Sequence, residues 1–102
     1  MDWKKPENQA LVEAVLALRT PDEAERFLRD LLTPAEIEEF AKRFQTAEML
    51  MDKVPYSKIE RITGLSSTTV ARVSKWLKGS EGGYRTVIAR LHHHSTPLAR
   101  VG

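Results

Sequence analysis

The sequence of 102 residues predicts an all-α fold, and three observations support this prediction. Apolar residues recur at intervals of three and four through most of the chain, which is the spacing of amphipathic helices. Two short sequences combine threonine, proline and glutamate in the order that marks a helix start. No segment has the pattern of a strand, so we expect six helices, and the length favours one domain over residues 1–102.

The N-terminal region is expected to form two short helices within residues 7–32. Leu11, Val15 and Leu18 follow helical spacing in the first of them. The second helix begins at residues 20–23 (Thr-Pro-Asp-Glu), which form a capping box with proline at the first helical position. Because short helices are marginal in isolation, we expect their apolar faces to pack against a second copy of the chain.

A long central helix is predicted over residues 33–54. It starts with a second capping box at residues 33–36 (Thr-Pro-Ala-Glu), and its apolar stripe continues to Met51, shortly before Pro55. A last helix is expected over residues 83–92. Residues 93–102 show no periodicity and are expected to form a loose tail.

Residues 56–78 carry the pattern of a helix–turn–helix. A short helix ends at Gly64, a turn of three residues follows, and Ser66 can cap a second helix. Ile59 and Val70 are among the apolar residues that face inward from the two helices. Two helices joined by so short a turn cross steeply, which is the geometry of this motif.

The outer face of the second of these helices carries small hydroxyls and cations, which bind base edges and phosphates. The two halves of the chain also differ in charge, because residues 1–51 hold 7 Lys/Arg and 11 Asp/Glu whereas residues 52–102 hold 9 and 3. Such asymmetry favours a polyanionic partner, and we predict double-stranded DNA. A solvated helix face with an N-cap run is the plainer alternative. The predicted DNA-binding residues are Ser66, Ser67, Thr68, Thr69, Arg72 and Lys75, flanked by Lys53, Lys58, Arg61 and Lys78.

About two-thirds of the chain resembles the Trp repressor superfamily, and more narrowly the Trp repressor-like proteins of the YerC/YecD group. The resemblance rests on residues 31–36 (Leu-Leu-Thr-Pro-Ala-Glu), on Arg43, and on the motif from Ile59 to Lys78 with Gly64 and Thr69-Val70-Ala71-Arg72. It implies a six-helix Trp repressor-like fold and an intertwined homodimer of the N-terminal helices. It also implies a bacterial transcriptional regulator, a repressor in particular, whose two helix–turn–helix motifs enter half-sites about 34–36 Å apart.

The same resemblance implies a corepressor site. Trp repressor binds tryptophan between the start of its central helix and its recognition helix, and four positions of that pocket are matched here. Val73, however, stands where the family has a glycine, and Trp76 where it has a serine. We expect these larger side chains to fill the pocket, so that free tryptophan does not bind. The remnant pocket comprises Thr33, Arg43, Thr69, Arg72, Val73 and Trp76.

Several other functions find no support in the sequence. The chain has no cysteine, and three consecutive histidines, residues 92–94, point about 100° apart on a helix, so we expect no metal and no cofactor. There is no glycine-rich phosphate loop and no serine with a paired histidine and carboxylate, so we expect no enzyme. No apolar run is long enough to span a bilayer and the N-terminus does not resemble a signal peptide, so we expect a cytoplasmic protein with no membrane partner.

Two alternatives to an autonomous DNA-binding regulator stay open. One is a polymerase-associated helix-turn-helix subunit that resembles a sigma-factor region. The other is a protein–protein adaptor whose helix–turn–helix no longer binds DNA. The operator and any small-molecule effector other than tryptophan also stay open.

Overall fold

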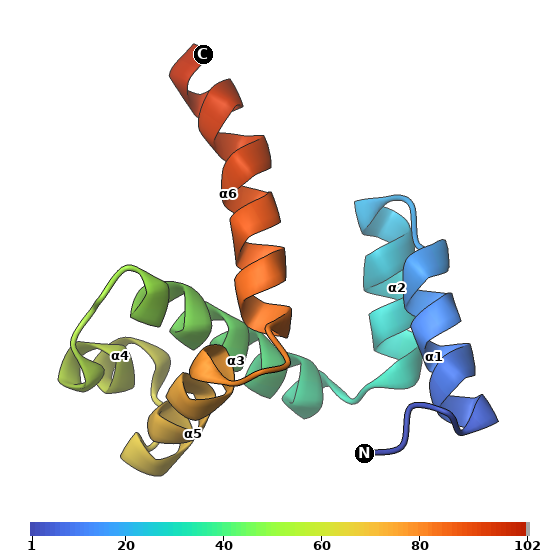
Figure 1. The fold of residues 1–102 in the computed structure, drawn as a ribbon, viewed down its shortest axis with the longest axis horizontal. Coiled ribbons are helices and arrows are strands. Elements are labelled where there is room, and N and C mark those ends of the chain that lie inside the picture. The colour runs from blue at the N-terminus through green and yellow to red at the C-terminus, as the bar shows by residue number, and fades with distance from the viewer. Residues whose placement is uncertain (102) are drawn as a thin grey trace. The chain divides into compact units, whose positions relative to one another are not determined.

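The computed structural model describes the backbone of residues 1–101 and the side chains of residues 1–92. This part of the chain contains six α-helices and no strand, which confirms the predicted all-α fold. The contacts within the chain divide it into two compact units, Met1–Ile37 and the residues from Glu38 onward. The helices are α1 (Pro6–Ala17), α2 (Pro21–Leu31), α3 (Pro34–Met51), α4 (Tyr56–Thr63), α5 (Ser67–Lys78) and α6 (Gly83–Val101), as Figure 1 shows.

Side-chain caps start the helices α2 and α3. Thr20 Oγ1 accepts a hydrogen bond from the Glu23 N–H at 3.1 Å and thereby caps α2. At α3 the box is reciprocal, because Thr33 Oγ1 accepts from the Glu36 N–H (3.2 Å) and the Glu36 carboxylate accepts from the Thr33 N–H (2.9 Å). The N–H of Thr33 and the hydroxyl of Thr33 both stabilise the charged carboxylate, and the pKa of Glu36 is lowered.

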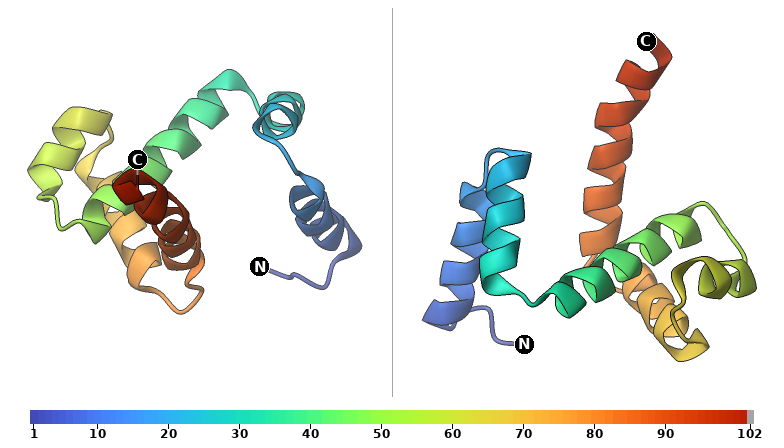
Figure 2. Two further views of the ribbon diagram at one scale, coloured as in Figure 1. Left: turned by 90° about the horizontal axis from the view of Figure 1, so that it is seen from above. Right: turned by 180° about the vertical axis from the view of Figure 1, so that it is seen from behind.

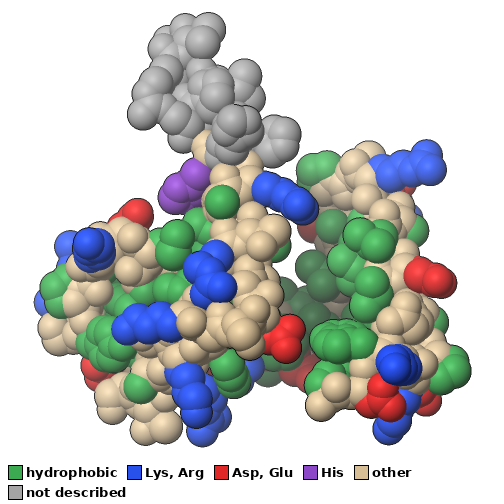
Figure 3. All heavy atoms as spheres, in the orientation of Figure 1, with side chains coloured by type: hydrophobic (Ala, Val, Ile, Leu, Met, Phe, Trp, Pro, Cys, Tyr) green, Lys and Arg blue, Asp and Glu red, His purple; other side chains and the backbone are tan. Residues whose placement is uncertain are grey.

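The apolar stripes of the first unit are not covered. Helices α1 and α2 run in opposite directions, and neither contains a buried residue (Figure 1 and the right panel of Figure 2). Leu16 is 77% exposed, and Val15 and Leu31 are about half exposed. Figure 3 shows these helices with apolar side chains at the surface. The local signals of the sequence therefore form the helices without giving them a core.

The second unit has a core of its own in two clusters. One joins α3, α5 and α6 through Ala47, Val73, Leu77 and Ile88. The other joins α4 and α5 through Ile59, Leu65 and Val70. Leu50 of α3 packs against both clusters and connects them. This core fixes the position of α5 against α3, α4 and α6.

The C-terminal helix is longer than the sequence analysis predicts. Its backbone is helical as far as Val101, so the expected end at residue 92 and the loose tail are wrong for residues 93–101, while residue 102 lies outside the described part. A sequence without periodic apolar residues lacks the mark of an amphipathic helix, but this does not exclude a helix. Leu98, Ala99 and Arg100 have high helix propensities, whereas Pro97 is unfavourable inside a helix, so residue propensity alone does not explain the helical backbone of this segment. No helix in the described part of the chain is long and apolar enough to cross a membrane.

Candidate nucleic-acid interface

The turn between α4 and α5 is fixed by one glycine and one buried threonine. Gly64 has φ 76°, a left-handed conformation that side chains disfavour, and its N–H donates to the Glu60 carbonyl at 2.8 Å. The Thr63 hydroxyl donates to the Ile59 carbonyl (2.7 Å) and accepts from the Leu65 N–H (3.2 Å). Leu65 itself is buried between the helices. These bonds set the angle at which α5 leaves the turn.

The hydroxyls at the start of α5 have two different roles. The Ser66 Oγ accepts from the Thr69 N–H at 3.2 Å and donates to Thr69 Oγ1 at 3.1 Å, so this pair caps the helix. Ser67 and Thr68 are exposed, and their hydroxyls make no hydrogen bond among the described residues. Ser67 and Thr68 are therefore the hydroxyls available to an external partner.

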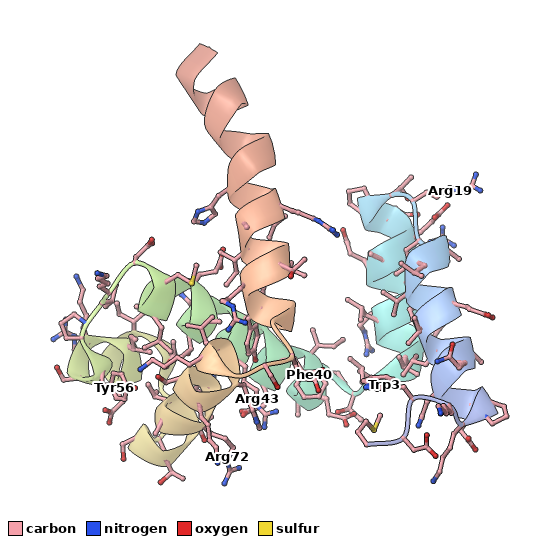
Figure 4. All side chains as sticks on the ribbon, viewed as in Figure 1. Trp3, Arg19, Phe40, Arg43, Tyr56 and Arg72 are labelled. Atoms are coloured by element: carbon pink, nitrogen blue, oxygen red, sulfur yellow. The ribbon has the colours of Figure 1, made fainter. Side chains whose placement is uncertain are left out.

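Helix α5 has one buried and one exposed face. Val70, Val73 and Leu77 are buried, whereas Arg72 and Lys75 are exposed. Thr68, Arg72 and Lys75 are spaced by four and three residues and therefore share one face of the helix. Figure 4 shows Arg72 projecting away from the core.

All ten predicted DNA-binding residues lie in the second unit, but they do not form one cluster. Lys58 and Arg61 lie on α4, close in sequence to the turn, whereas Lys53 follows α3 and Lys78 ends α5. A helix of 12 residues is about 18 Å long, so Lys78 lies far from the hydroxyls at the start of α5. Thr69 is half-buried, and the other nine are exposed: Lys53, Lys58, Arg61, Ser66, Ser67, Thr68, Arg72, Lys75 and Lys78.

Arg43 and Trp76 of the predicted remnant pocket lie together. The Arg43 Cζ is 5.6 Å from the centroid of the Phe40 ring and 6.0 Å from that of Trp76. The guanidinium Nε also donates to Glu39 at 3.2 Å, four residues earlier on α3. Arg43 is thus held by a carboxylate and by two aromatic faces.

The remaining positions of the remnant pocket have other surroundings. Val73 is completely buried in the core cluster with Ala47. Thr33 belongs to the first unit, and its hydroxyl accepts the hydrogen bond from the Glu36 N–H that caps α3. Thr69 shares its hydroxyl with Ser66, and Arg72 is exposed.

Trp76 also forms one wall of an open aromatic hollow of about 750 Å³. Its indole is 46% exposed, so it does not belong to the core. Phe44, Tyr84 and Val87 line the same hollow, and the Phe44 and Tyr84 rings lie 6.4 Å apart. Burial raises the pKa of Tyr84, and the charge of Arg43 partly offsets this effect.

Two residues of this region were not found from the sequence. Phe40 precedes Arg43 by three residues on α3, so helical spacing alone could have paired them. Arg85 of α6 donates to the carbonyl of Leu77 near the end of α5. No sequence signal indicates that bond, because it crosses a turn that depends on Gly82 at φ 72°.

No group of three metal-binding side chains converges within residues 1–92. His93 and His94, which the sequence analysis considered with His92, lie beyond the residues whose side chains are described.

The fold defines a small all-α protein of six helices, in which a turn of three residues joins α4 to α5. Residues 7–92 match the Trp repressor protein family, and the chain belongs to that family. This is a family of regulatory DNA-binding proteins and not of enzymes.

Relatives of known sequence or structure span nearly the whole chain. It is 35% identical over 86 residues to the uncharacterized protein YerC of Bacillus subtilis (strain 168), covering 84% of this chain and 83% of YerC. It is similar to the crystal structure of a TrpR like protein from Eubacterium eligens ATCC 27750, with a TM-score of 0.81 and 37% identity over 87% of this chain and 92% of that one. A candidate Trp repressor from Staphylococcus aureus gives a TM-score of 0.82 and 29% identity over 90% and 95% of the two chains.

Proposed function

We propose that this protein is a homodimeric transcriptional repressor that binds a palindromic DNA site through α5 and does not respond to tryptophan. The observation that carries the proposal is the exposed stripe of Thr68, Arg72 and Lys75 above the buried Val70 and Val73. The buried side of α5 holds the helix rigidly, while the exposed side offers a hydroxyl and two cations to a partner.

In this proposal the N-terminal part of α5 enters the major groove. Arg72 can donate two hydrogen bonds to a guanine, and the hydroxyls of Ser67 and Thr68 can bond base edges or phosphates. Lys58 and Arg61 of α4 contact the DNA backbone and set the register without selecting a sequence. A dimer seated on promoter DNA excludes polymerase, which is why we propose repression.

The uncovered helices of the first unit support the homodimer. Leu11, Val15 and Leu16 of α1 and Leu28 of α2 are 40–77% exposed. Helices this short need a partner surface to be stable. A two-fold dimer would place two copies of α5 in half-sites about 34–36 Å apart.

The surroundings of two residues support independence from tryptophan. Val73 fills core volume with its side chain, where the resemblance places a glycine. The Trp76 indole lies within 6.0 Å of the Arg43 guanidinium, where the resemblance places a serine. The chain thus supplies its own indole to this arginine.

Selection from a random duplex library, with and without L-tryptophan, tests the proposal. We expect a palindromic motif with half-sites one helical turn apart, and the same motif in both arms. Enrichment only with L-tryptophan would refute a closed corepressor pocket, and calorimetric titration would then show heat at micromolar ligand.

No enrichment in either arm would favour the protein–protein adaptor. Sedimentation of a stable monomer at low concentration would favour the polymerase-associated subunit.

A further inference from the structure

A second hollow lies where the end of α3, the start of α4 and the end of α5 meet. Its volume is about 320 Å³, at the lower end of the range of small-molecule sites, about 300–1,000 Å³. Leu50, Val54 and Leu77 give it an apolar floor. None of its lining residues belongs to the remnant tryptophan pocket described above. The polar groups that line it are Lys53, Tyr56, Ser74 and Lys78.

Lys53 stands at a backbone position that favours glycine. Its N–H donates to the Leu50 carbonyl and the Val54 N–H donates to the Met49 carbonyl, both at 3.0 Å, which is the Schellman arrangement that ends α3. Lys53 therefore has φ 60°, the only positive φ of a residue other than glycine in the described backbone. A side chain is disfavoured there, so a lysine at this position is uncommon.

Ser74 presents an unpartnered hydroxyl to the same hollow. Its side chain is only 5% exposed, and its Oγ makes no hydrogen bond among residues 1–92. Its Oγ is not fully enclosed, because Thr46 Oγ1 is the only enclosed side-chain oxygen or nitrogen without a partner among the described residues; the Ser74 hydroxyl is therefore open to the hollow. Lys53 and Lys78 likewise take part in neither of the ion pairs found in that range. The hollow thus combines two unpaired cations with one unpaired donor.

We propose that this hollow binds a small organic carboxylate with a compact apolar body. The carboxylate accepts a hydrogen bond from Ser74 and is paired with Lys53 and Lys78, since charge-assisted hydrogen bonds are the stronger ones. The apolar body rests on Leu50 and Leu77. An inorganic anion would satisfy the cations but leave the apolar floor in water.

The ligand would also act on DNA binding, and this consequence rests on the proposed function. Lys53 and Lys78 are among the cations predicted to contact phosphates. A bound carboxylate neutralises them, so we expect weaker DNA binding and a salt dependence reduced by about two phosphate contacts. The ligand would therefore act as an inducer.

Titration of the full chain, without DNA and followed by ¹⁵N–¹H amide shifts, tests the site. The probes are phenylacetate and isovalerate, with phenylacetamide as the uncharged match and inorganic phosphate as the anion without an apolar body. We expect saturable shifts around Lys53 and Ser74 with the two carboxylates, and at least tenfold weaker binding of the other two probes.

Three variants separate the site from general surface charge. Lys53→Asn removes the cation but keeps a residue that tolerates positive φ, and Ser74→Ala removes only the hydroxyl. We expect each of these, and Lys78→Gln, to weaken phenylacetate binding at least fivefold with an unchanged melting temperature. Lys42→Gln removes an exposed lysine that does not line the hollow, and we expect it to change nothing.

The proposal would be overturned if neither carboxylate gave a saturable shift, or if phosphate or phenylacetamide bound as tightly as the carboxylates. It would also be overturned if Lys42→Gln lost as much affinity for phenylacetate as the variants of the hollow. Weaker DNA binding of Ser74→Ala in the absence of carboxylate would overturn it too, because the hollow would then bind a DNA phosphate. Carboxylate binding in a protein that binds no duplex under any condition would refute the proposed function and leave the site intact.

Discussion

The two units of this chain show how helix formation and core formation can separate. Helices α1 and α2 have proline at their starts, and α2 has a side-chain cap, yet neither buries a residue. Helices α4 and α5 are also short, with 8 and 12 residues against 12 and 11 in α1 and α2, but they share a core with α3 and α6. Short-range signals are thus sufficient to specify a helix but not to cover it. The first unit has helices without buried residues, whereas the second has a core of its own.

The largest expected effect follows from replacing two apolar residues of α1 by aspartate. Val12 and Leu16 are four residues apart and share one face of α1, exposed by 37% and 77%. If a second copy covers this face, Val12→Asp/Leu16→Asp places two charges in an apolar interface and weakens the dimer by about a thousandfold, or about 4 kcal/mol. Sedimentation equilibrium measures the change.

Glu13→Gln, between the two positions, serves as the control and should leave the dimer intact. If the double variant also stayed dimeric, the exposed face of α1 would not be the dimer interface. The absence of buried residues in the first unit would then not be explained by dimer formation.

An effect of comparable size, on folding and not on association, is expected from a cavity in the second unit. Ile88 of α6 is 1% exposed and packs in the cluster with Val73, so Ile88→Ala should reduce the free energy of unfolding by about 2–5 kcal/mol. Thr86→Ala, on the exposed side of the same helix, should change it by less than about 0.5 kcal/mol. Urea denaturation at constant protein concentration compares them, and equal effects would mean that α6 is not part of the core.

Much of this fold could be predicted because its signals are local. The threonine caps, Gly64 in the turn and the apolar spacing of α4 and α5 each act within a few residues. The buried and exposed faces of α5 follow from the same spacing. The end of α6 was predicted wrongly, because apolar periodicity marks an amphipathic face and does not mark where a helix ends.

The surroundings of the site residues could not be predicted in the same way. Trp76 could be matched to a family position, but its stacking with Arg43 joins α5 to α3 across 33 positions of sequence. The hollow beside Ser74 depends on three helices and on the left-handed backbone of Lys53. Such features follow from tertiary packing and leave no periodic trace in the sequence.

Two cations of the second unit should differ in what they contribute to DNA binding. Arg72→Ala should weaken binding to a cognate site by about 1–3 kcal/mol and relax selectivity at one base pair. Lys58→Ala should weaken binding evenly across sequences and reduce the salt slope by about one. Fluorescence anisotropy with cognate and scrambled duplexes at several salt concentrations distinguishes them. Unchanged affinity in both variants would mean that the interface lies elsewhere.

The smallest expected effect concerns Glu36, in the cap where α3 begins. Hydrogen bonds from Thr33 lower the pKa of Glu36 below its ordinary value of 4.5, so the folded state favours the charged carboxylate. A carboxyl group with a lowered folded pKa stabilises the fold fully above pH 4.5, and this contribution is lost as the pH falls through the lowered pKa. Thermal unfolding from pH 7 to pH 3 should show this loss in the parent chain and less of it in Glu36→Gln. Glu38→Gln, two residues further along α3, serves as the control and should keep the pH dependence of the parent chain. If the unfolding temperature of Glu36→Gln changed with pH as it does in the parent, the cap would be formed equally in the unfolded chain. This local signal of the first unit would then not stabilise the folded state over the unfolded one.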